Sequence, residues 1–230
     1  MSNILQIETA TTVCSVALAT DGKLVACKQV DQRNIHAEVI TLFIEELIAS
    51  AGLKFTDLDA IAVSSGPGSY TGLRIGISTA KGLCYALDKP LIAVETLDAM
   101  ANGVIAEAPA DLSANTLLCP MIDARRMEVY TALFDTAGNK VKATAAEIIN
   151  GDTFKQLLQT NPILFFGDGA EKCREVIGDS PNAKFLTGFI NSAAHLSQQA
   201  AYKFNEGDFE DVAYFEPYYL KDFLVTKKQS

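Results

Sequence analysis

Residues 60–76 read AIAVSSGPGSYTGLRIG, and this stretch decides the expected fold. Its first part is a short apolar run typical of a buried strand, its middle is a glycine turn, and its end starts a helix that we expect over residues 71–87. Ser69 or Thr71 can cap this helix, because a side-chain oxygen at a helix start accepts a free backbone N–H. A strand, a glycine turn and a helix start together form a shape that binds anions.

The turn itself supplies three candidates for contact with a nucleotide or another anion, namely Gly66, Gly68 and Ser69. The lysine that follows the last glycine of a P-loop is missing, and Lys81 lies too far along the helix to replace it. A plain connecting turn explains the same residues equally well, so both interpretations stay open.

The helix after the turn has two faces that favour burial. Beside its apolar stripe, Gly72, Gly76 and Thr79 form a face of small residues that lets another backbone approach closely. The helix expected over 36–51 has an equally wide apolar surface. One lobe can bury one face of each helix, so we expect a partner chain on the other, although a single chain that covers both faces is an alternative. The expected interface residues are Val39, Ile40, Phe43, Ile44, Leu47, Leu73, Gly76, Ile77, Ala80 and Cys84.

The order of elements repeats along the chain. The first series has strands within 4–30, followed by a helix, a strand, a helix and a strand. The second series has strands at 117–122, 128–134 and 140–142, a helix at 152–159, a strand at 163–166 and helices at 169–177 and 192–205. An acidic residue, Glu8 or Asp123, ends the first strand of each series. Two α/β lobes built alike, 1–107 and 108–230, are the simplest interpretation, with chance similarity of short hairpins as the alternative.

The composition fits a soluble cytoplasmic protein. The chain has 230 residues, 49% of them hydrophobic, and no stretch approaches the roughly 18 apolar residues of a membrane helix, so we expect no membrane contact. Its net charge of -9 argues against unaided nucleic-acid binding, because clustered lysine and arginine make most phosphate contacts. The five cysteines are widely spaced without a CxxC pair, which favours reduced, packed thiols.

Five segments resemble the TsaB members of the TsaD/glycoprotease family. They are ILQIETATTVCSVAL at 4–18, SSGPGSYTGLRIGISTAKGL at 64–83, MIDARRMEVYTALF at 121–134, FGDGA at 166–170 and the closing EPYYLK at 216–221. The resemblance implies the duplicated ribonuclease-H-like fold of actin, sugar kinases and heat-shock ATPases. It also implies that Gly167 and Gly169, in the glycine turn of the second lobe, join the candidate nucleotide contacts.

The same resemblance implies a function in the complex that places threonylcarbamoyl on the adenosine beside the anticodon of tRNAs reading codons that begin with A. The implied partners are a TsaD-type catalytic subunit and a TsaE-type ATPase, with a homodimer when the chain is alone. We expect tRNA to be met only through the complex. ATP or ADP and magnesium are expected at the level of the complex, with no cofactor held firmly by this chain.

Catalytic relatives of the TsaD type carry two metal-binding histidines in a segment V-N-H-L-E-A-H. The corresponding residues 94–100 read VETLDAM, so Thr96 and Met100 stand in the histidine positions. Neither side chain replaces imidazole as a ligand. We therefore expect no catalytic residue and no metal site, and a non-catalytic partner subunit. The alternative is a metal-dependent glycopeptidase-like enzyme or an ATPase.

The remaining polar candidates have a structural and a functional interpretation each. Glu8 and Asp123 could hold magnesium between the lobes, but the family usually has Asp at the first position, and capping of the following turn is favoured. The pair Arg125 and Arg126 could bind an anionic ligand or nucleic acid, although ion pairs on the surface or with a partner are more common in an acidic chain.

The sequence has two histidines. His36 with Glu38 at a helix start is expected to be solvated, and His195 is expected to be an ordinary helix residue.

Overall fold

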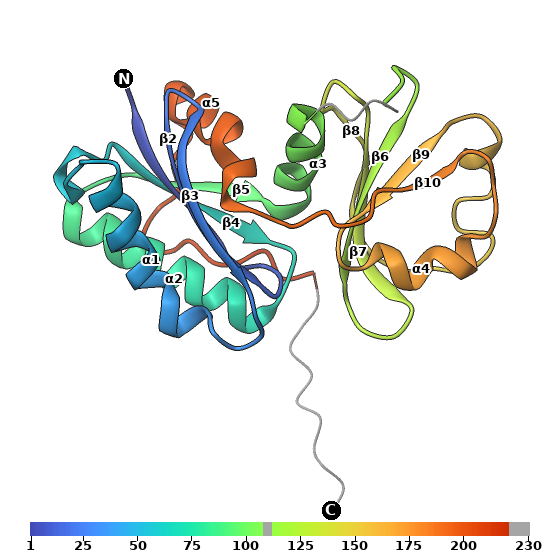
Figure 1. Ribbon diagram of the computed structural model, residues 1–230, viewed down its shortest axis with the longest axis horizontal. Coiled ribbons are helices and arrows are strands. Elements are labelled where there is room, and N and C mark those ends of the chain that lie inside the picture. The colour runs from blue at the N-terminus through green and yellow to red at the C-terminus, as the bar shows by residue number, and fades with distance from the viewer. Residues whose placement is uncertain (108–111, 221–230) are drawn as a thin grey trace, which may run out of the picture.

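The computed structural model describes residues 1–107 and 112–220, so part of the predicted boundary segment 107–114 and Lys221 of the closing motif lie outside the described residues. Two five-stranded sheets stand side by side, each flanked by helices (Figure 1). The first sheet has the order β3 (Lys23–Asp31), β2 (Val13–Thr20), β1 (Asn3–Glu8), β4 (Ala60–Gly66), β5 (Leu91–Glu95). The second has the order β8 (Lys140–Ile148), β7 (Glu128–Phe134), β6 (Leu117–Asp123), β9 (Ile163–Phe166), β10 (Ala183–Phe185).

The two sheets have the same topology. β1 pairs antiparallel with β2 and parallel with β4, and β6 pairs in the same way with β7 and β9. The outer strands β3 and β8 extend each hairpin, while β5 and β10 extend each parallel half. This correspondence confirms the predicted duplicated two-lobe α/β fold.

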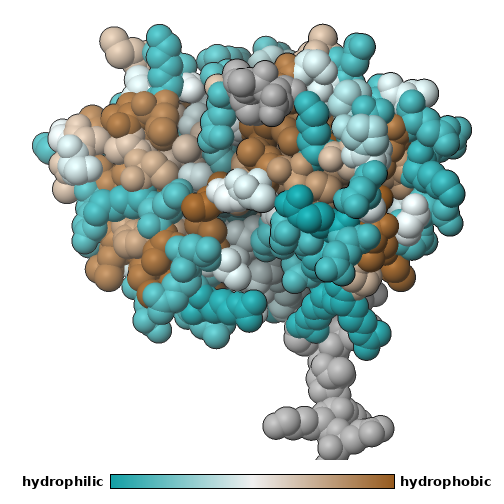
Figure 2. Space-filling view, turned by 45° about the vertical axis from the view of Figure 1, so that its right-hand side comes forward, coloured by the Kyte–Doolittle hydropathy of each residue, from teal (hydrophilic) through white to brown (hydrophobic). Residues whose placement is uncertain are grey.

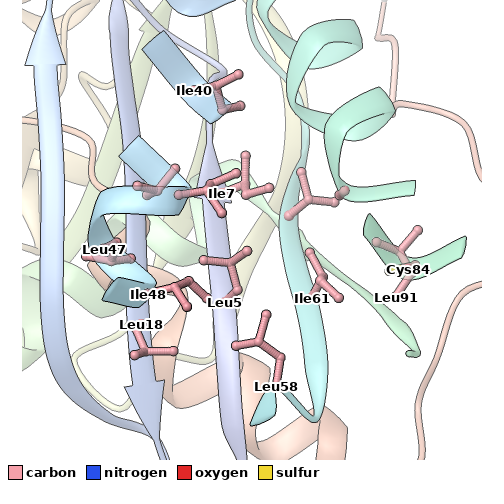
Figure 3. Packing of buried hydrophobic residues seen from close by; sticks show 14 of the residues in the cluster. Leu5, Ile7, Leu18, Ile40, Leu47, Ile48, Leu58, Ile61, Cys84 and Leu91 are labelled. Carbon is pink, nitrogen blue, oxygen red and sulfur yellow. The ribbon is translucent and has the colours of Figure 1, made fainter. Parts of the chain in front are cut away.

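Two helices cover one face of the first sheet, α1 (His36–Ser50) and α2 (Tyr70–Leu87). Figure 3 shows Ile40, Leu47 and Ile48 of α1 in the same buried cluster as Leu5 and Ile7 of β1. These side chains are almost completely buried, and each buried aliphatic group of this size contributes about 1.5–3 kcal/mol. Successive residues of a strand face opposite sides, so Gln6 and Glu8 lie on the other face of β1.

The last helix of each half packs on the sheet of the other half. In α3 (Thr96–Glu107), Leu97 and Val104 join a cluster with Phe134 and Phe166 of the second sheet. After β10 the chain returns between the lobes (Figure 1), where the short 3-10 helix η3 (Ala193–Leu196) and α5 (Ser197–Glu206) cover the first sheet. Residue 107 therefore precedes the second sheet, but residues 193–206 pack with the first lobe.

Three elements differ from the sequence-based expectation. Residues 152–159 form turns and the 3-10 helix η2 (Leu157–Gln159) in place of a helix, because only Phe154 and Leu158 of this segment are buried. β8 continues to Ile148, well beyond the predicted 140–142. β10 was not predicted, since Ala183–Phe185 is only half-buried. α4 (Ala170–Ile177) and the 3-10 turn η1 (Phe55–Asp57) complete the structure.

The surface carries its apolar residues in separate patches among hydrophilic ones on the face shown in Figure 2. Among the helices of the described residues, none is both long enough and apolar enough to cross a membrane.

Candidate functional site

The glycine turn after β4 is built around the chain's own β1–β2 turn. The N–H of Ser69 donates to the carbonyl oxygen of Ala10 at 2.6 Å, and a Cβ on Gly68 would lie 2.4 Å from that oxygen. The hydroxyl of Ser69 accepts the N–H of Gly72 at 3.2 Å, which confirms Ser69 as the cap of α2. The turn thus connects β4 to α2 and also holds the β1–β2 turn. One of its backbone donors, the N–H of Ser69, is therefore already used within the chain.

The small-residue face of α2 corrects an expectation about the partner surface. A Cβ on Gly72 would lie 2.0 Å from the carbonyl oxygen of Thr9, and one on Gly76 would lie 2.2 Å from the hydroxyl of Thr9. The backbone that approaches this face therefore belongs to the same chain. The two glycines are needed because the β1–β2 turn crosses directly over the helix.

The residues expected at a partner interface are mostly internal. Eight of them are buried inside the first lobe, because the sheet and the neighbouring turn take up both faces that the sequence pattern predicts: Ile40, Ile44, Leu47, Leu73, Gly76, Ile77, Ala80 and Cys84. Val39 and Phe43 are half-buried and remain accessible, as are Ile75 and Leu83 of α2. We call these four side chains the outer helix surface.

A cleft of about 1460 Å³ lies between the lobes. Residues 10–12, 67–72 and the segment 33–37 line it from the first lobe, and the β6–β7 turn with Asp168 lines it from the second. Gly68 and Ser69 are therefore part of a ligand-sized space. Gly66, Gly167 and Gly169 are not among its lining residues. A Cβ on Gly167 would lie 2.4 Å from the carbonyl oxygen of Met121, so this glycine serves close packing.

The acidic residues that end the first strand of each half make the same local hydrogen bond. Glu8 accepts the N–H of Ala10 at 2.6 Å, and Asp123 accepts the N–H of Arg125 at 2.8 Å. Each carboxylate thus caps the turn two residues ahead, as the structural interpretation predicted. Asp123 also pairs with Lys172 and lines the cleft, whereas Glu8 is fully buried behind it. The described residues contain no cluster of three or more His, Cys, Asp or Glu suited to a metal ion.

Burial has the largest effect on the pKa values of two carboxyl groups, those of Glu8 and Asp168. It raises the pKa of Glu8 to about 7, although hydrogen bonds from Ala10 and the hydroxyl of Ser64, at 2.9 Å, favour the charged form. The amide of Asn191 faces this carboxyl without reaching hydrogen-bonding geometry. Burial likewise raises the pKa of Asp168, which accepts the N–H of Asp123 at 3.0 Å.

Both histidines serve packing. His36 was expected to be solvated, but it is buried, with Nε2 at 3.1 Å from the carbonyl oxygen of Thr11 and 3.2 Å from that of Val13. It thereby ties the start of α1 to the β1–β2 turn. His195 stacks on Phe189, and burial lowers its pKa to about 4, so the ring is neutral. Among the cysteines, all of which are free, Cys27 is exposed, contrary to the expected packing.

The C-terminal segment packs against the end of β4 and the start of α2, a contact that the periodicity of the sequence cannot indicate. The N–H of Tyr218 donates to the carbonyl oxygen of Ser65 at 2.8 Å, and the ring of Tyr219 packs on Tyr70 with centroids 4.8 Å apart. Arg74 donates to the hydroxyl of Tyr219 at 3.1 Å. The motif at 216–220 thus fastens the end of the described chain to the start of α2.

Replacing Tyr219 with alanine should loosen this segment. The variant loses the ring contact with Tyr70 and the hydrogen bond from Arg74, together about 1 kcal/mol at this half-buried position. We expect faster proteolysis of the segment and a small drop in the free energy of unfolding in urea. Tyr214→Ala is the control, because its side chain is 83% exposed. Equal cleavage rates for both variants would contradict the role of Tyr219.

The chain is similar over most of its length to proteins of one family. Residues 30–228 match the family model described as TsaD, tRNA N6-adenosine threonylcarbamoyltransferase. The chain is 32% identical over 233 residues to the tRNA threonylcarbamoyladenosine biosynthesis protein TsaB of Escherichia coli, covering 98% of this chain and 97% of the relative.

Solved structures give the same picture of the fold. A Pseudomonas aeruginosa protein described as similar to the peptidase YeaZ superposes with a TM-score of 0.82 at 25% identity, over 96% of this chain and all of the other. The activator of 2-hydroxyisocaproyl-CoA dehydratase from Clostridium difficile reaches a TM-score of 0.50 at 10% identity, over 90% of this chain and 96% of the other, which is a likeness of fold alone.

Proposed function

The chain belongs to the TsaB group of the TsaD family and serves in the biosynthesis of threonylcarbamoyladenosine in tRNA, and on this premise we propose that it does so as a non-catalytic partner of a TsaD-type transferase. In this role it pairs with the catalytic subunit and supports transfer of threonylcarbamoyl to the adenosine beside the anticodon. The chemistry itself takes place on the partner.

The observation that carries this proposal is the fate of the two positions where catalytic relatives have metal-binding histidines. Thr96 and Met100 are 0% and 1% exposed, at the start of α3. Met100 packs so closely against Gly167 that a Cβ there would lie 2.7 Å from its Cε. Neither residue lines the cleft. Thr96 is thus enclosed and Met100 packs in the contact between the lobes, which supports a role without metal chemistry.

The partner is proposed to dock on the outer helix surface. Its four apolar side chains come from two neighbouring helices and lie beside the core of the first lobe without being fully covered. Half-buried apolar groups on adjacent helices suit helix packing across an interface. When the chain is alone, a second copy is proposed to cover the same surface.

Introducing a charge on this surface should abolish docking. Phe43→Asp or Leu83→Asp places a carboxylate in an apolar contact, and we expect affinity for the TsaD-type subunit to fall at least about a hundredfold. Calorimetric titration of the purified chains measures this. Leu24→Asp is the matched control, since Leu24 is 52% exposed on the edge strand β3 and is not part of the outer helix surface. Unchanged affinity in both helix variants would refute the surface.

Three measurements test the function itself. Depletion of the protein in its source cell should lower threonylcarbamoyladenosine in bulk tRNA, and a normal level would overturn the assignment. Stoichiometric zinc or iron in the purified chain, or steady ATP turnover by the chain alone, would overturn its non-catalytic role in favour of a metal-dependent or ATP-hydrolysing enzyme.

The assembly around the chain extends this proposal. A TsaE-type ATPase is proposed to join the complex, in the cytoplasm where tRNA is modified. ATP or ADP with magnesium would be held at the level of the complex, because the two candidate acids of this chain do not fit a shared magnesium site: Glu8 is buried behind the cleft and Asp123 is engaged by Lys172.

A further inference from the structure

Arginine and tyrosine gather in the cleft between the lobes. Three of the five arginines of the chain and four of its seven tyrosines line this one space: Arg33, Arg125, Arg126, Tyr70, Tyr130, Tyr218 and Tyr219. In a chain with a net charge of -9, such a concentration of guanidinium groups marks the cleft as unlike the rest of the surface.

The three cleft arginines make no ion pair with any residue that the structure describes. The other two arginines are engaged, Arg74 with Tyr219 and Arg174 with Glu171. The expectation that Arg125 and Arg126 form ordinary surface ion pairs is therefore not met by the described residues. Guanidinium groups left without carboxylates in one cleft are available to an anionic ligand.

The lining holds three acidic residues, as many as its arginines, but two of the three are engaged or largely buried. Asp123 is paired with Lys172, and Asp168 accepts a backbone N–H in a largely buried position, where its pKa is raised. Glu128 is the third acid of the lining, and Lys172 adds a positive charge beside Asp123. The net charge of the cleft and its rim, with Lys172 included, is thus slightly positive.

The two lobes supply the arginines from separate segments. Arg33 lies between β3 and α1, whereas Arg125 and Arg126 lie in the β6–β7 turn of the second lobe. A ligand held by all three must be long enough to touch both lobes. Guanidinium groups that contact phosphates, together with aromatic rings that stack on bases, are the combination that binds single-stranded RNA.

We propose that this cleft binds the sugar-phosphate backbone of a single-stranded RNA segment, with the anticodon loop of the tRNA substrate as its ligand. The inference rests on the proposed function and goes beyond it, because it gives this chain a direct contact with tRNA in addition to the contact made through the complex. The phosphate of a free nucleotide offers related chemistry, and the experiment separates the two sources.

The test compares the wild-type chain with the variant Arg33→Gln, Arg125→Gln, Arg126→Gln, each alone and in complex with the TsaD-type subunit. The probe is a fluorescent RNA hairpin that carries the anticodon loop of a tRNA reading codons that begin with A, and anisotropy gives Kd at several salt concentrations. We expect Kd to rise at least about tenfold in the variant, and the slope of log affinity against log salt to fall by about 2, or about 0.7 for each lost phosphate contact.

Arg174→Gln is the matched control, because Arg174 lies half-buried on α4 outside the cleft. Equal RNA affinity for the triple variant and the wild type, or no RNA binding by the wild-type complex, would overturn the inference. So would arginine-dependent binding of ADP or inorganic phosphate without binding of the hairpin, which would assign the cleft to a small anion.

Calorimetric titration with the TsaD-type subunit distinguishes a failure of this inference from a failure of the proposed function. The triple variant should bind that subunit as the wild type does, because the arginines lie outside the outer helix surface. If the triple variant keeps its RNA affinity and still binds the partner, the RNA contact alone is refuted. If the wild-type chain does not bind the TsaD-type subunit at all, the proposed function is refuted.

Discussion

Alanine at position 72 is expected to destabilise the protein by at least about 3 kcal/mol, because the added Cβ would lie 2.0 Å from the carbonyl oxygen of Thr9. No side-chain rotation relieves a clash with a backbone atom. Either the β1–β2 turn or the start of α2 has to move, and each carries part of the cleft lining. Urea unfolding of the purified variant measures the change.

Gly82→Ala on the same helix is the control for this prediction. Beyond the backbone of its own helix, no atom of the described residues lies within 4 Å of the position of its Cβ, so the substitution should stabilise the protein by about 1 kcal/mol through helix propensity. If both substitutions gave similar free energies of unfolding, the close approach of the Thr9 carbonyl to α2 would be disproved.

Removing the titration of Glu8 should abolish part of the pH dependence of stability. The pKa of this carboxyl is about 7 in the folded state and 4.5 for a solvated glutamate, so the folded protein binds a proton more tightly than the unfolded chain. Its contribution is complete below about pH 4.5, decreases as pH rises towards 7, and is lost above that. The difference between the two pKa values corresponds to about 3 kcal/mol in the free energy of unfolding.

In Glu8→Gln the amide oxygen can still accept from Ala10 and Ser64, and no charge forms. We therefore expect the variant to match the wild type near pH 4.5 and to exceed it by up to about 3 kcal/mol at pH 8. Urea unfolding of both proteins across this range gives the difference. A difference that is the same at every pH would show that Glu8 is charged in the folded protein.

Much of the fold could be predicted because its signals are local. The apolar runs of β1, β4, β7 and β9 are bounded by turn residues, and Ser69 stands where a helix cap is expected. β10 was missed since a half-buried strand containing Lys184 has no apolar pattern to detect. The helix expected at 152–159 was wrong because two buried side chains do not sustain a helical face.

The candidate site was harder to predict, because periodicity shows that a face is buried but not what buries it. The small face of α2 indicated an approaching backbone correctly, yet that backbone comes from Thr9, far away in the sequence. The cleft depends on a similar long-range arrangement, since Arg33 and Arg125 line one space only because the two lobes stand side by side. The paired arginines Arg125 and Arg126 of the β6–β7 turn can be singled out from the sequence, whereas the isolated Arg33 of the first lobe cannot.

The crossing of α3 and α5 between the lobes links the folding of the two halves. A break in the chain after Glu107 would leave one fragment with α3 but without the second sheet that covers it, and the other with α5 but without the first. Each fragment would expose the apolar side of a helix and of a sheet. Although the topology is duplicated, neither copy is a complete folding unit, and a fragment with one sheet could bury these surfaces only against its missing half or another copy.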